Sequence, residues 1–517
     1  MRRKFPLKNK LLPLTLAFAL IISFIGYHEE NISKALGFDV QWNQKAHEIK
    51  TKIVDQNKEV NYSVGGEQEM NAVLQKQLED IVEEYELAGV QVAAVNEKGT
   101  IVSGNAGKHS LEDKTEIDDN TILRSASVSK AFTAVATMQL VEQQQIDLDA
   151  DINDYLELEV DIKHPEYPDT NITPRMLLNH SSGMTNGTYV SFASNSINRG
   201  NRQKTPPSLS EVFDEEGEFY SNSIWSEYKP GEKFIYTNLG YIVLGAIVEN
   251  VSGMNFDEYT NENIFNPLGM NSSSFNINDL RNSRRGRDRD RIAPLYRRTV
   301  EYIDQEESVE SKKSTIKDNE KTLENKDQQH NRQRQVHFRG TNFGDLPEFS
   351  NYRPGRNGSL YSPQGGLFTT ATDLAKFASA MINGGEYQGN RILEQETIEL
   401  MKQVSVSSCA QDWTDFDGLF KKQGLGLHIT DELLEDGITL YGHPGIAYGL
   451  LSGVYFTDHT EQTEQSRREN NFGIVYLING ANTEIPGSSD TFYEIEEEIA
   501  KTVYDSLYDS IKKAGEH

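Results

Sequence analysis

The chain has 517 residues, of which 51 are lysine or arginine and 79 are aspartate or glutamate, so its formal net charge is −28. The length leaves room for two to four domains and a large core, and the acidic balance excludes nonspecific nucleic-acid binding as the main role. The single cysteine, Cys409, excludes an intrachain disulfide and any cysteine-based metal cluster.

A basic segment followed by a hydrophobic run opens the chain. Five lysines and arginines within the first ten residues precede the run 11–27. This run is about as long as the shortest membrane-spanning helix and longer than an ordinary signal-peptide core. We therefore expect residues 1–27 to be an uncleaved anchor with the rest of the chain on the extracytoplasmic face; the alternative is a cleaved signal peptide and secretion. Residues 28–66 are polar and predict a tether.

A large globular domain is expected over residues 67–514. Apolar residues at helical spacing begin near Met70, and apolar runs at 90–95 and 100–102 predict a hairpin that turns at Lys98-Gly99. The next segment, 124–132, places Ser127 at the start of a predicted amphipathic helix. Lys130 follows three residues later, so the hydroxyl and the amine share one helix face. Free N–H groups at a helix start also favour a developing anion.

The pattern Ser-x-x-Lys is not specific by itself, because it recurs in this chain at Ser226/Lys229, Ser314/Lys317 and Ser510/Lys513. Only Ser127 is followed by a helical apolar stripe that could bury a catalytic turn. A serine hydroxyl is nearly inert at neutral pH and needs a base to accept its proton. We therefore interpret Ser127 as the candidate nucleophile and Lys130 as a candidate base.

The middle of the chain predicts two further helices. One starts after Thr173, which is expected to cap it, with Pro174 at its first position. His180 follows and fits a helix-ending turn better than a catalytic base. Residues 186–228 are rich in Asn, Ser and Gly and predict an extended surface loop. A strongly apolar helix then follows the sequence 236–238 and should end at Gly253.

Residues 281–340 differ sharply in composition from the rest of the chain. They hold 16 lysines and arginines against 11 acidic residues and few large apolar residues. We expect a disordered or loosely ordered insertion. Two hypotheses stay open for it: a merely solvated loop, and an arm that contacts an anionic envelope polymer or membrane surface.

The final third is predicted to be rich in strands, with apolar runs at 425–429, 438–441, 450–456 and 472–477 and a closing helix over 492–511. Helix and strands at both ends of the chain indicate one shared sheet. The predicted fold is therefore α/β (α+β), an antiparallel sheet flanked by helices, beside a helical domain.

Three spaced elements, in this order, resemble the serine β-lactamase and penicillin-binding protein superfamily, especially its class C-like branch: Ser127 with Lys130, Tyr236-Thr237-Asn238, and His443-Pro444-Gly445. The flanking segments 230–241 and 364–375 are also similar to the family. The resemblance covers about residues 67–280 and 355–510, and the joint match is far more specific than any one element. It implies the β-lactamase/transpeptidase-like fold, with the active site between the sheet and the helical domain.

The resemblance also implies roles for individual residues. Ser127 would be acylated, and Lys130 and Tyr236 would transfer its proton, with either of them as the base. A nearby cation would lower the tyrosine pKa, and burial would ease deprotonation of the lysine. Substrate binding would fall to Asn238, His443 and Gly445. The oxyanion hole would be formed by the backbone N–H groups of Ser127 and Ile446. No cofactor or metal is implied.

The third element departs from the commoner pattern Lys-Thr/Ser-Gly. A lysine there is a permanent cation for a substrate carboxylate, whereas His443 has an ordinary pKa of about 6.5 and is mostly neutral. A histidine at this position resembles the pattern of the esterase-like and D-amino-acid peptidase-like members. The sequence thus predicts a serine hydrolase of small-molecule or cell-wall-derived esters or D-amino-acid amides. The alternatives are a penicillin-binding DD-carboxypeptidase or weak β-lactamase, and a non-catalytic module that senses cell-wall fragments or β-lactams.

Overall fold

The computed structural model describes residues 67–203, 205–281, 291–304, 332–347, 351–407, 418–434, 437–457, 471–481 and 491–514. The expected anchor and tether, 1–66, lie outside the described residues. One compact unit spans Met70–His517, and the fold below is the fold of that unit. Among the described residues no single helix is long and apolar enough to cross a membrane, although one bent pair, Asn238–Ser252 with Phe256–Phe265 at 79°, passes by length and composition.

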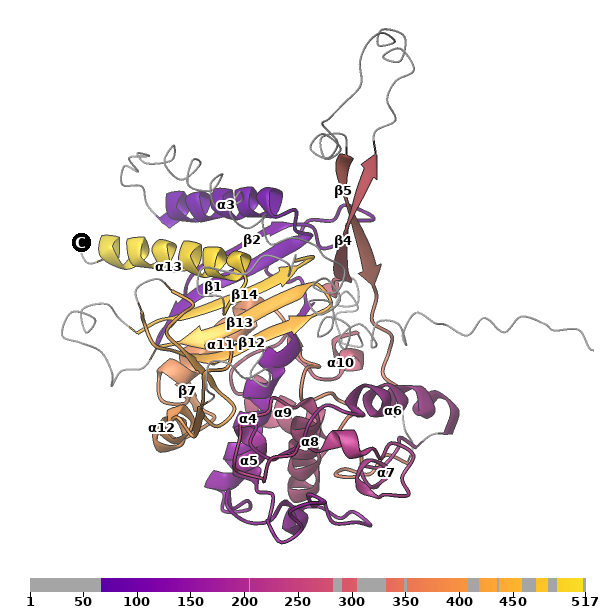
Figure 1. Cartoon of the computed structure of the whole chain (residues 1–517). Coiled ribbons are helices and arrows are strands. Elements are labelled where there is room, and N and C mark those ends of the chain that lie inside the picture. Colours follow the sequence, from indigo (N-terminus) through magenta and orange to yellow (C-terminus); the bar gives the residue numbers. More distant parts are fainter. Residues whose placement is uncertain are drawn as a thin grey trace, which may run out of the picture. The chain divides into compact units, whose positions relative to one another are not determined.

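An antiparallel sheet of eight strands forms one layer of the unit (Figure 1). Its order is β2 (Gly99–Gly107), β1 (Gly89–Asn96), β14 (Gly473–Asn479), β13 (Leu450–Phe456), β12 (Leu440–Ala447), β11 (His428–Thr430), β10 (Lys422–Gln423) and β9 (Val406–Ser407). β1 pairs directly with β14, with Val90 opposite Ile478. The expected sheet built from both chain ends is therefore confirmed.

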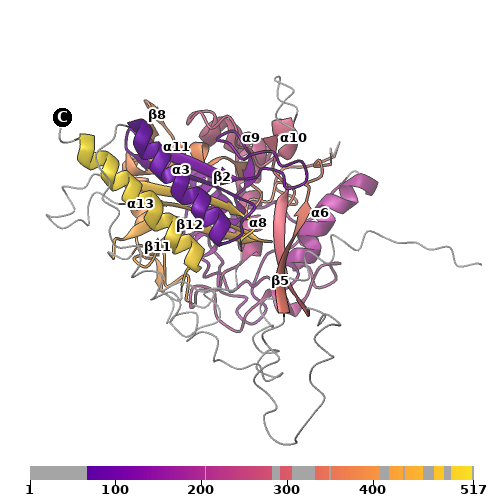
Figure 2. The same ribbon diagram turned by 90° about the horizontal axis from the view of Figure 1, so that it is seen from above.

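Both faces of the sheet are covered, because successive side chains in a strand point to opposite faces. Val90 and Val92 of β1 join the apolar cluster under α3 (Glu67–Glu84) and α13 (Glu494–Ala514), while Ala93 and Val95 join the cluster on the other side. The two terminal helices lie side by side over the first face (Figure 2). α11 (Ala371–Ile382) packs on the second face. Burial on both faces explains why these strands are apolar runs.

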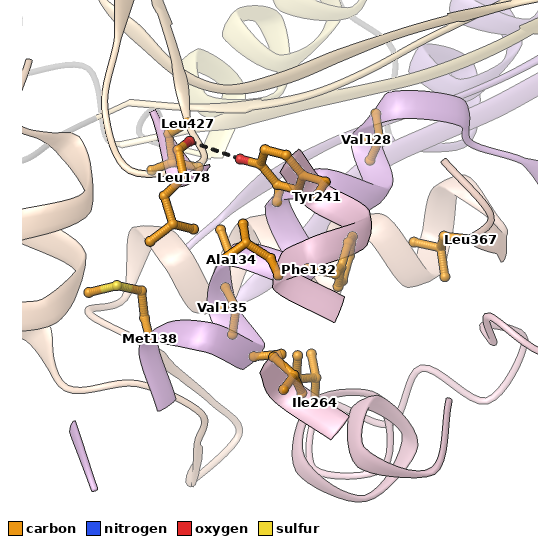
Figure 3. Close-up of a cluster of buried hydrophobic side chains, with 14 of the residues drawn as sticks. Val128, Phe132, Ala134, Val135, Met138, Leu178, Tyr241, Ile264, Leu367 and Leu427 are labelled. Carbon is orange, nitrogen blue, oxygen red and sulfur yellow. Dashed lines mark hydrogen bonds between the residues drawn. The ribbon is translucent and has the colours of Figure 1, made fainter. Parts of the chain in front are cut away.

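The helical region is centred on α4 (Ser129–Glu142), which packs against α8 (Asn238–Ser252). Figure 3 shows Phe132, Val135 and Met138 of α4 among Tyr241 and Ile264. The expectation that this helix is amphipathic is wrong: every residue from 129 to 140 is buried. A helix surrounded by protein on all sides has no solvent face, so its polar residues must find partners inside the core.

The remaining elements complete this region and its loops. The helices are η1 (Ala126–Val128), η2 (Ile152–Tyr155), α5 (Pro174–Leu178), α6 (Tyr189–Gln203), α7 (Ser210–Phe213), η3 (Asn222–Ile224), α9 (Phe256–Thr260), η4 (Asn261–Phe265), α10 (Ile277–Arg281) and α12 (Gln395–Lys402). Short two-stranded pairs join β3 (Leu123–Arg124) to β6 (Phe368–Thr369) and β7 (Glu386–Tyr387) to β8 (Asn390–Arg391). Thr173 caps α5 by accepting from Met176 N, as expected.

Two expectations from composition are corrected. The segment 186–228 is not an extended loop, because it contains α6 and α7, whose buried Phe192 and Val212 anchor them. The segment 281–340 is not disordered throughout: β4 (Leu295–Asp304) pairs with β5 (Arg332–Thr341) as a separate two-stranded ribbon. Its base is held by Tyr296, which is 1% exposed. The high charge of this segment obscured the alternation of residues that is typical of a strand.

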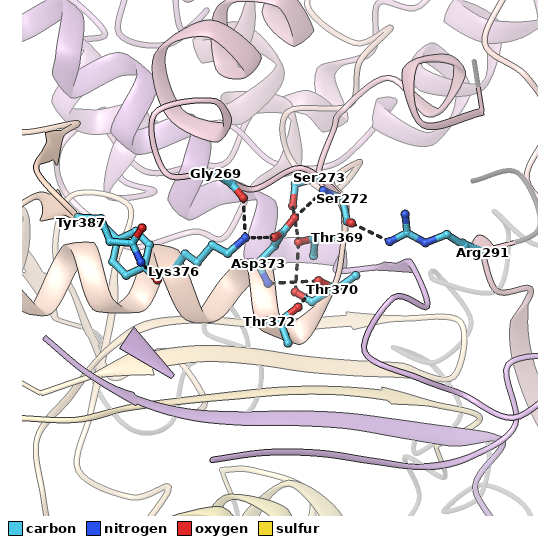
Figure 4. A network of polar contacts seen from close by, with 11 residues as sticks. Gly269, Ser272, Ser273, Arg291, Thr369, Thr370, Thr372, Asp373, Lys376 and Tyr387 are labelled. Carbon is cyan, nitrogen blue, oxygen red and sulfur yellow. Dashed lines mark hydrogen bonds and ion pairs between the residues drawn. The ribbon is translucent and has the colours of Figure 1, made fainter. Parts of the chain in front are cut away.

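A polar network joins α11, on the sheet, to the segment before α10 (Figure 4). Asp373 accepts hydrogen bonds from Ser272 N at 2.7 Å and Ser273 Oγ at 2.9 Å, and Lys376 pairs with it at 2.8 Å. Arg291 donates to Ser272 Oγ at 2.7 Å. A carboxylate with several such donors holds its neighbours in one geometry. The network therefore fixes the helical region against the sheet layer.

Candidate active site

The turn η1 carries Ser127 and is held by the serines on either side of it. Ser125 donates through N and Oγ to Leu367 O, at 2.9 and 3.2 Å. Ser129 Oγ donates to Ala126 O at 2.6 Å and accepts from Leu367 N at 3.0 Å. Ala126 has φ of 46°, a left-handed conformation that costs energy for a residue with a side chain. The flanking contacts hold this strained turn in place.

Two predicted partners reach the Ser127 hydroxyl. Tyr236 OH donates to Ser127 Oγ at 2.9 Å, and Lys130 Nζ lies 3.2 Å from the same atom. Tyr236 directly precedes the capping residue of α8, while Lys130 is in the first turn of α4. The packing of α4 on α8 therefore brings together residues that are more than a hundred positions apart. The hydroxyl of Ser127, the amine of Lys130 and the phenol of Tyr236 are therefore connected by hydrogen bonds.

Lys130 is completely buried, and its ammonium nitrogen has three acceptors. Besides Ser127 Oγ these are Asn238 Oδ1 at 2.8 Å and Gln364 O at 2.7 Å. The nitrogen also lies 4.8 Å from the ring centroid of Tyr236 and 5.4 Å from that of Tyr241. Burial lowers the pKa of Lys130 well below its usual value. Neutral acceptors and rings only partly offset the lost hydration, so the amine form is favoured.

Tyr236 is also buried, and burial raises the pKa of its phenol, although the hydrogen bond with Ser127 acts in the opposite direction. This corrects the expectation that the neighbouring cation lowers it, because loss of hydration of the phenolate is the larger effect. The ring stacks on Phe420 at 4.9 Å and lies 4.5 Å from the ring of His180. The phenol therefore stays protonated at neutral pH.

Asn238 is the first residue of α8, where Thr237 caps the helix by accepting from Gly240 N. Its backbone N donates to Asn186 Oδ1 at 2.7 Å, and Asn186 Nδ2 donates to Tyr236 O at 3.2 Å. Asn186 thus holds the start of α8 while the side chain of Asn238, half-buried, accepts from Lys130. The contact with Lys130 fixes the amide of Asn238 beside the lysine, and the predicted substrate-binding role of Asn238 stays a prediction.

Strand β12 passes directly beside the nucleophile turn at Gly445. A side-chain carbon at this position would lie 2.5 Å from Ser125 O and 3.1 Å from Ser127 N. Only glycine allows this approach. Ser452 Oγ, from β13, donates to Ser125 O at 2.8 Å and closes the same contact. Gly445 is therefore needed for the close fit of strand and turn.

The register of β12 shows where the N–H of Ile446 points. β12 and β13 are joined by a two-residue turn at 448–449, and Ala447 pairs with Leu450. In such a hairpin the flanking pair is hydrogen-bonded and the next pair is not. The N–H of Ile446 therefore points away from β13, on the side of β12 where pairing with β11 ends at Gly442. This direction agrees with the predicted oxyanion role, and Ile446 is 37% exposed.

His443 lies beneath the site and is completely buried. Its Nδ1–H donates to Pro444 O at 2.6 Å, and its ring lies 5.7 Å from Phe420 and 6.4 Å from Tyr236. Burial, with a smaller contribution from Lys130, lowers the pKa of His443 well below its usual value. His443 is therefore a neutral, buried side chain beside Tyr236, and its predicted contact with substrate stays a prediction.

The sequence predicted no catalytic contact for three residues that neighbour the site. Gln364 supplies a carbonyl to Lys130, yet only its place in a family-like segment marked it. Phe420 stacks on Tyr236 and carried no sequence signal. His180 accepts from Thr237 N at 3.2 Å through Nδ1, and burial keeps its pKa well below the usual value. A turn role for His180, with φ of 60°, agrees with the prediction.

Comparison with known proteins identifies similar chains. The family described as Beta-lactamase matches residues 74–496. Penicillin-binding protein 4* of Bacillus subtilis (strain 168) is 27% identical over 201 residues, 39% of this chain and 40% of that protein, so the chain spans two fifths of this relative.

Two solved structures share the fold. The octameric penicillin-binding protein homologue from Pyrococcus abyssi has 21% identity, a TM-score of 0.52, and coverage of 84% of this chain and 80% of that chain. D-amino acid amidase from Ochrobactrum anthropi SV3 has 18% identity and a TM-score of 0.52, covering 86% and 99%. The predicted fold and the predicted family resemblance are thereby confirmed.

Proposed function

The chain belongs to the Beta-lactamase family, and on this premise we propose that it is a serine hydrolase acting through an acyl-enzyme on ester or D-amino-acid amide bonds. The observation that carries the proposal is the simultaneous contact of Ser127 Oγ with the phenol of Tyr236 and the amine of Lys130. A hydroxyl with a proton acceptor and a proton donor at hydrogen-bond distance can be both activated and protonated during acyl transfer.

Lys130 is the base in this proposal. Because burial favours its neutral form, the amine can take the proton of Ser127 as Oγ attacks the substrate carbonyl carbon. The new C–O bond forms while the carbonyl electrons move to oxygen. The resulting oxyanion is stabilised by the N–H groups of Ser127 and Ile446. Asn238 and Gln364 hold the charged lysine that results, through the two contacts not used by Ser127.

Tyr236 completes the proton path. When the tetrahedral intermediate collapses, the bond to the leaving oxygen or nitrogen breaks, and that atom takes the proton of the phenol. Lys130 then returns its proton to the phenolate, which it can reach because the lysine nitrogen and the phenol oxygen both lie within hydrogen-bond distance of Ser127 Oγ, now an ester oxygen. Water, or another nucleophile, enters the vacated position and repeats these steps in reverse to release the acid and regenerate the serine.

The neutral, buried His443 supports ester or D-amino-acid amide substrates over classical β-lactams, because the third element offers no lysine for a carboxylate. A penicillin-binding carboxypeptidase is the second candidate, and the name of the Bacillus relative favours it. We place the enzyme on the extracytoplasmic side of the membrane, in envelope metabolism. The hydrophobic run 11–27 supports this placement.

The test is an assay of the purified chain with p-nitrophenyl esters, D-alanyl amides and a chromogenic cephalosporin, together with intact-mass detection of the acyl-enzyme. Ser127→Ala should abolish turnover and the mass increment. Ser226→Ala is the matched control, because Ser226 belongs to a Ser-x-x-Lys match outside the site and should leave both unchanged. Activity that survives Ser127→Ala on every substrate would sink the assignment, whereas exclusive labelling by the cephalosporin would favour the second candidate.

A further inference from the structure

The ribbon of β4 and β5 forms a two-stranded sheet of its own and extends away from the eight-stranded sheet (Figures 1 and 2). Tyr296 N donates to Asn479 Oδ1 at 2.9 Å, and this bond ties the ribbon to the end of β14. Arg298 forms an ion pair with Glu86, which follows α3. Tyr296 and Arg298 are two residues apart in one strand, so they lie on the same face. This face therefore fixes the ribbon to the rest of the unit.

The opposite face of the ribbon carries two arginines side by side. Arg297 in β4 is directly opposite Arg339 in β5. Residues in such a pair have Cβ atoms about 5 Å apart, and like charges in this position destabilise the pairing of the strands. Arg297 is half-buried and Arg339 is exposed, and neither has a hydrogen bond or an ion pair within the described part of the chain. The repulsion between the two guanidinium groups is therefore uncompensated there.

The pairs on either side of the two arginines contain no acidic residue: they are Leu295 with Thr341 and Thr299 with His337. Acidic residues are plentiful elsewhere. Residues 281–340 carry a net charge of +5, so the rest of the chain carries −28 − 5 = −33. Two neighbouring arginines without an acidic partner are therefore exceptional in this chain, and they fit an anion that comes from outside it.

The chemistry of the pair indicates which anion fits. One guanidinium fork occupies both oxygens of a planar carboxylate, whereas the tetrahedral oxygens of a phosphate can accept from two forks in different directions. A membrane is a poorer fit, because anionic lipid surfaces are recognised by clusters of four to eight basic residues. A flat anionic surface would also repel the acidic remainder of the chain, whereas a narrow polymer can contact the ribbon without meeting it.

We propose that Arg297 and Arg339 form a docking surface for a linear polymer whose charged groups are phosphates. A phosphate held by both guanidinium groups removes their mutual repulsion. Nucleic acids are held by aromatic side chains that stack on the bases, and the four residues in the pairs on either side include no Phe, Tyr or Trp. The polymer is therefore one without bases. Neither arginine contacts Ser127 in the structure, so the inference goes beyond the proposed function and does not depend on it.

The experiment measures binding of fluorescently labelled inorganic polyphosphate to the full chain by anisotropy. The wild type should bind, with a Kd that rises steeply as salt is added. The double variant Arg297→Gln/Arg339→Gln should bind about 10- to 100-fold more weakly. The matched control is Lys98→Gln/Arg353→Gln, which removes two exposed positive charges outside the ribbon and should leave the Kd unchanged. No binding by the wild type, or an equal Kd for the wild type and the arginine variant, overturns the proposal, and so does an equal loss in the control.

Further arms of the experiment test the partner and the surface. Polyacrylate, a linear polymer of carboxylates, should bind more weakly than polyphosphate, and equal binding would contradict the phosphate assignment. If the arginine variant loses binding to vesicles of phosphatidylglycerol and phosphatidylcholine but keeps its affinity for polyphosphate, the partner is a membrane and the proposal fails. Replacing residues 305–331 by Asn-Gly removes five lysines and seven acidic residues, so polyphosphate binding should persist; its loss would place the surface in the replaced residues and refute the proposal.

Thermal unfolding separates binding from folding. Removal of a like-charge pair should leave the Tm of Arg297→Gln/Arg339→Gln equal to that of the wild type or raise it. A lower Tm together with weaker binding would assign the loss to the structure of the ribbon and overturn the proposal. Arg297→Lys/Arg339→Lys keeps the charge and loses the forks, so its Kd should be intermediate, and a Kd as weak as that of the glutamine variant at an unchanged Tm would still support recognition by the forks.

Discussion

Replacing Tyr236 by phenylalanine separates the two candidate bases. An ordinary tyrosine has a pKa of about 10, so roughly one phenol in a thousand is ionised at pH 7. Burial raises the pKa of Tyr236 and makes that fraction smaller still, whereas burial lowers the pKa of Lys130. Tyr236→Phe keeps the stacking on Phe420 and removes the hydroxyl that donates to Ser127. We expect kcat for a D-alanyl amide to fall about 100-fold, because its amine leaving group takes the proton of the phenol in the proposed mechanism.

The dependence of kcat/KM on pH distinguishes the two candidate bases more clearly. A lysine base works in its neutral form, so kcat/KM should rise with pH through the pKa of Lys130 in the free enzyme. That acidic limb should persist in Tyr236→Phe, measured from pH 5 to 10. Tyr259→Phe is the matched control: Tyr259 begins the chain's other Tyr-Thr-Asn, and its hydroxyl is buried without a partner. An unchanged rate, or loss of the acidic limb, in Tyr236→Phe would refute the reasoning.

Three other predictions concern the frame of the site. Gly445→Ala should lower kcat about 100-fold with an unaltered circular dichroism spectrum, because the added carbon would lie 3.1 Å from Ser127 N; full activity would contradict this reading. Burial raises the pKa of Glu249 to about 7, so its contribution to stability is complete below about pH 4.3 and is lost as the pH rises through 7. Urea unfolding should show that the free energy of unfolding falls by about 3 kcal/mol between those pH values, and that this fall is smaller in Glu249→Gln. An equal fall in the two proteins would argue against this reading. Replacing residues 305–331 by Asn-Gly should leave ester turnover unchanged, since Asp304 and Arg332 already pair across β4 and β5; lost turnover would show that the replaced residues serve the site.

Local spacing was enough to mark the candidate catalytic residues. Ser127 and Lys130 are one helical turn apart, and Tyr236 stands just before a capped, strongly apolar helix, so each element is encoded within a few neighbouring residues. Their meeting depends on the packing of α4 against α8, which the family resemblance implied and no single segment encodes. The short contacts at Ser127 agree with that expectation.

What the sequence could not predict depends on residues distant in the chain. The burial of His443 depends on the rings that pack against it, and Phe420 among them lies in a segment with no pattern of its own. Composition also misled at 186–228 and 281–340. There the polar and charged residues of a helix face or a ribbon resemble those of a loop, and only a few buried side chains, such as Phe192 and Tyr296, fix the structure.

Exclusion of water sets the base strength of Lys130 in the proposed mechanism. Lys130 has a lowered pKa because of burial, and no second cation is needed for that effect. A lysine at position 443, as in the commoner family pattern, would place another charge in the same buried layer, where it would oppose the charge that Lys130 gains when it takes the proton of Ser127. A neutral histidine avoids this repulsion but cannot hold an anion. It follows that burial alone sets the base strength of Lys130 in the proposed mechanism, and that a neutral residue at position 443 leaves it undisturbed.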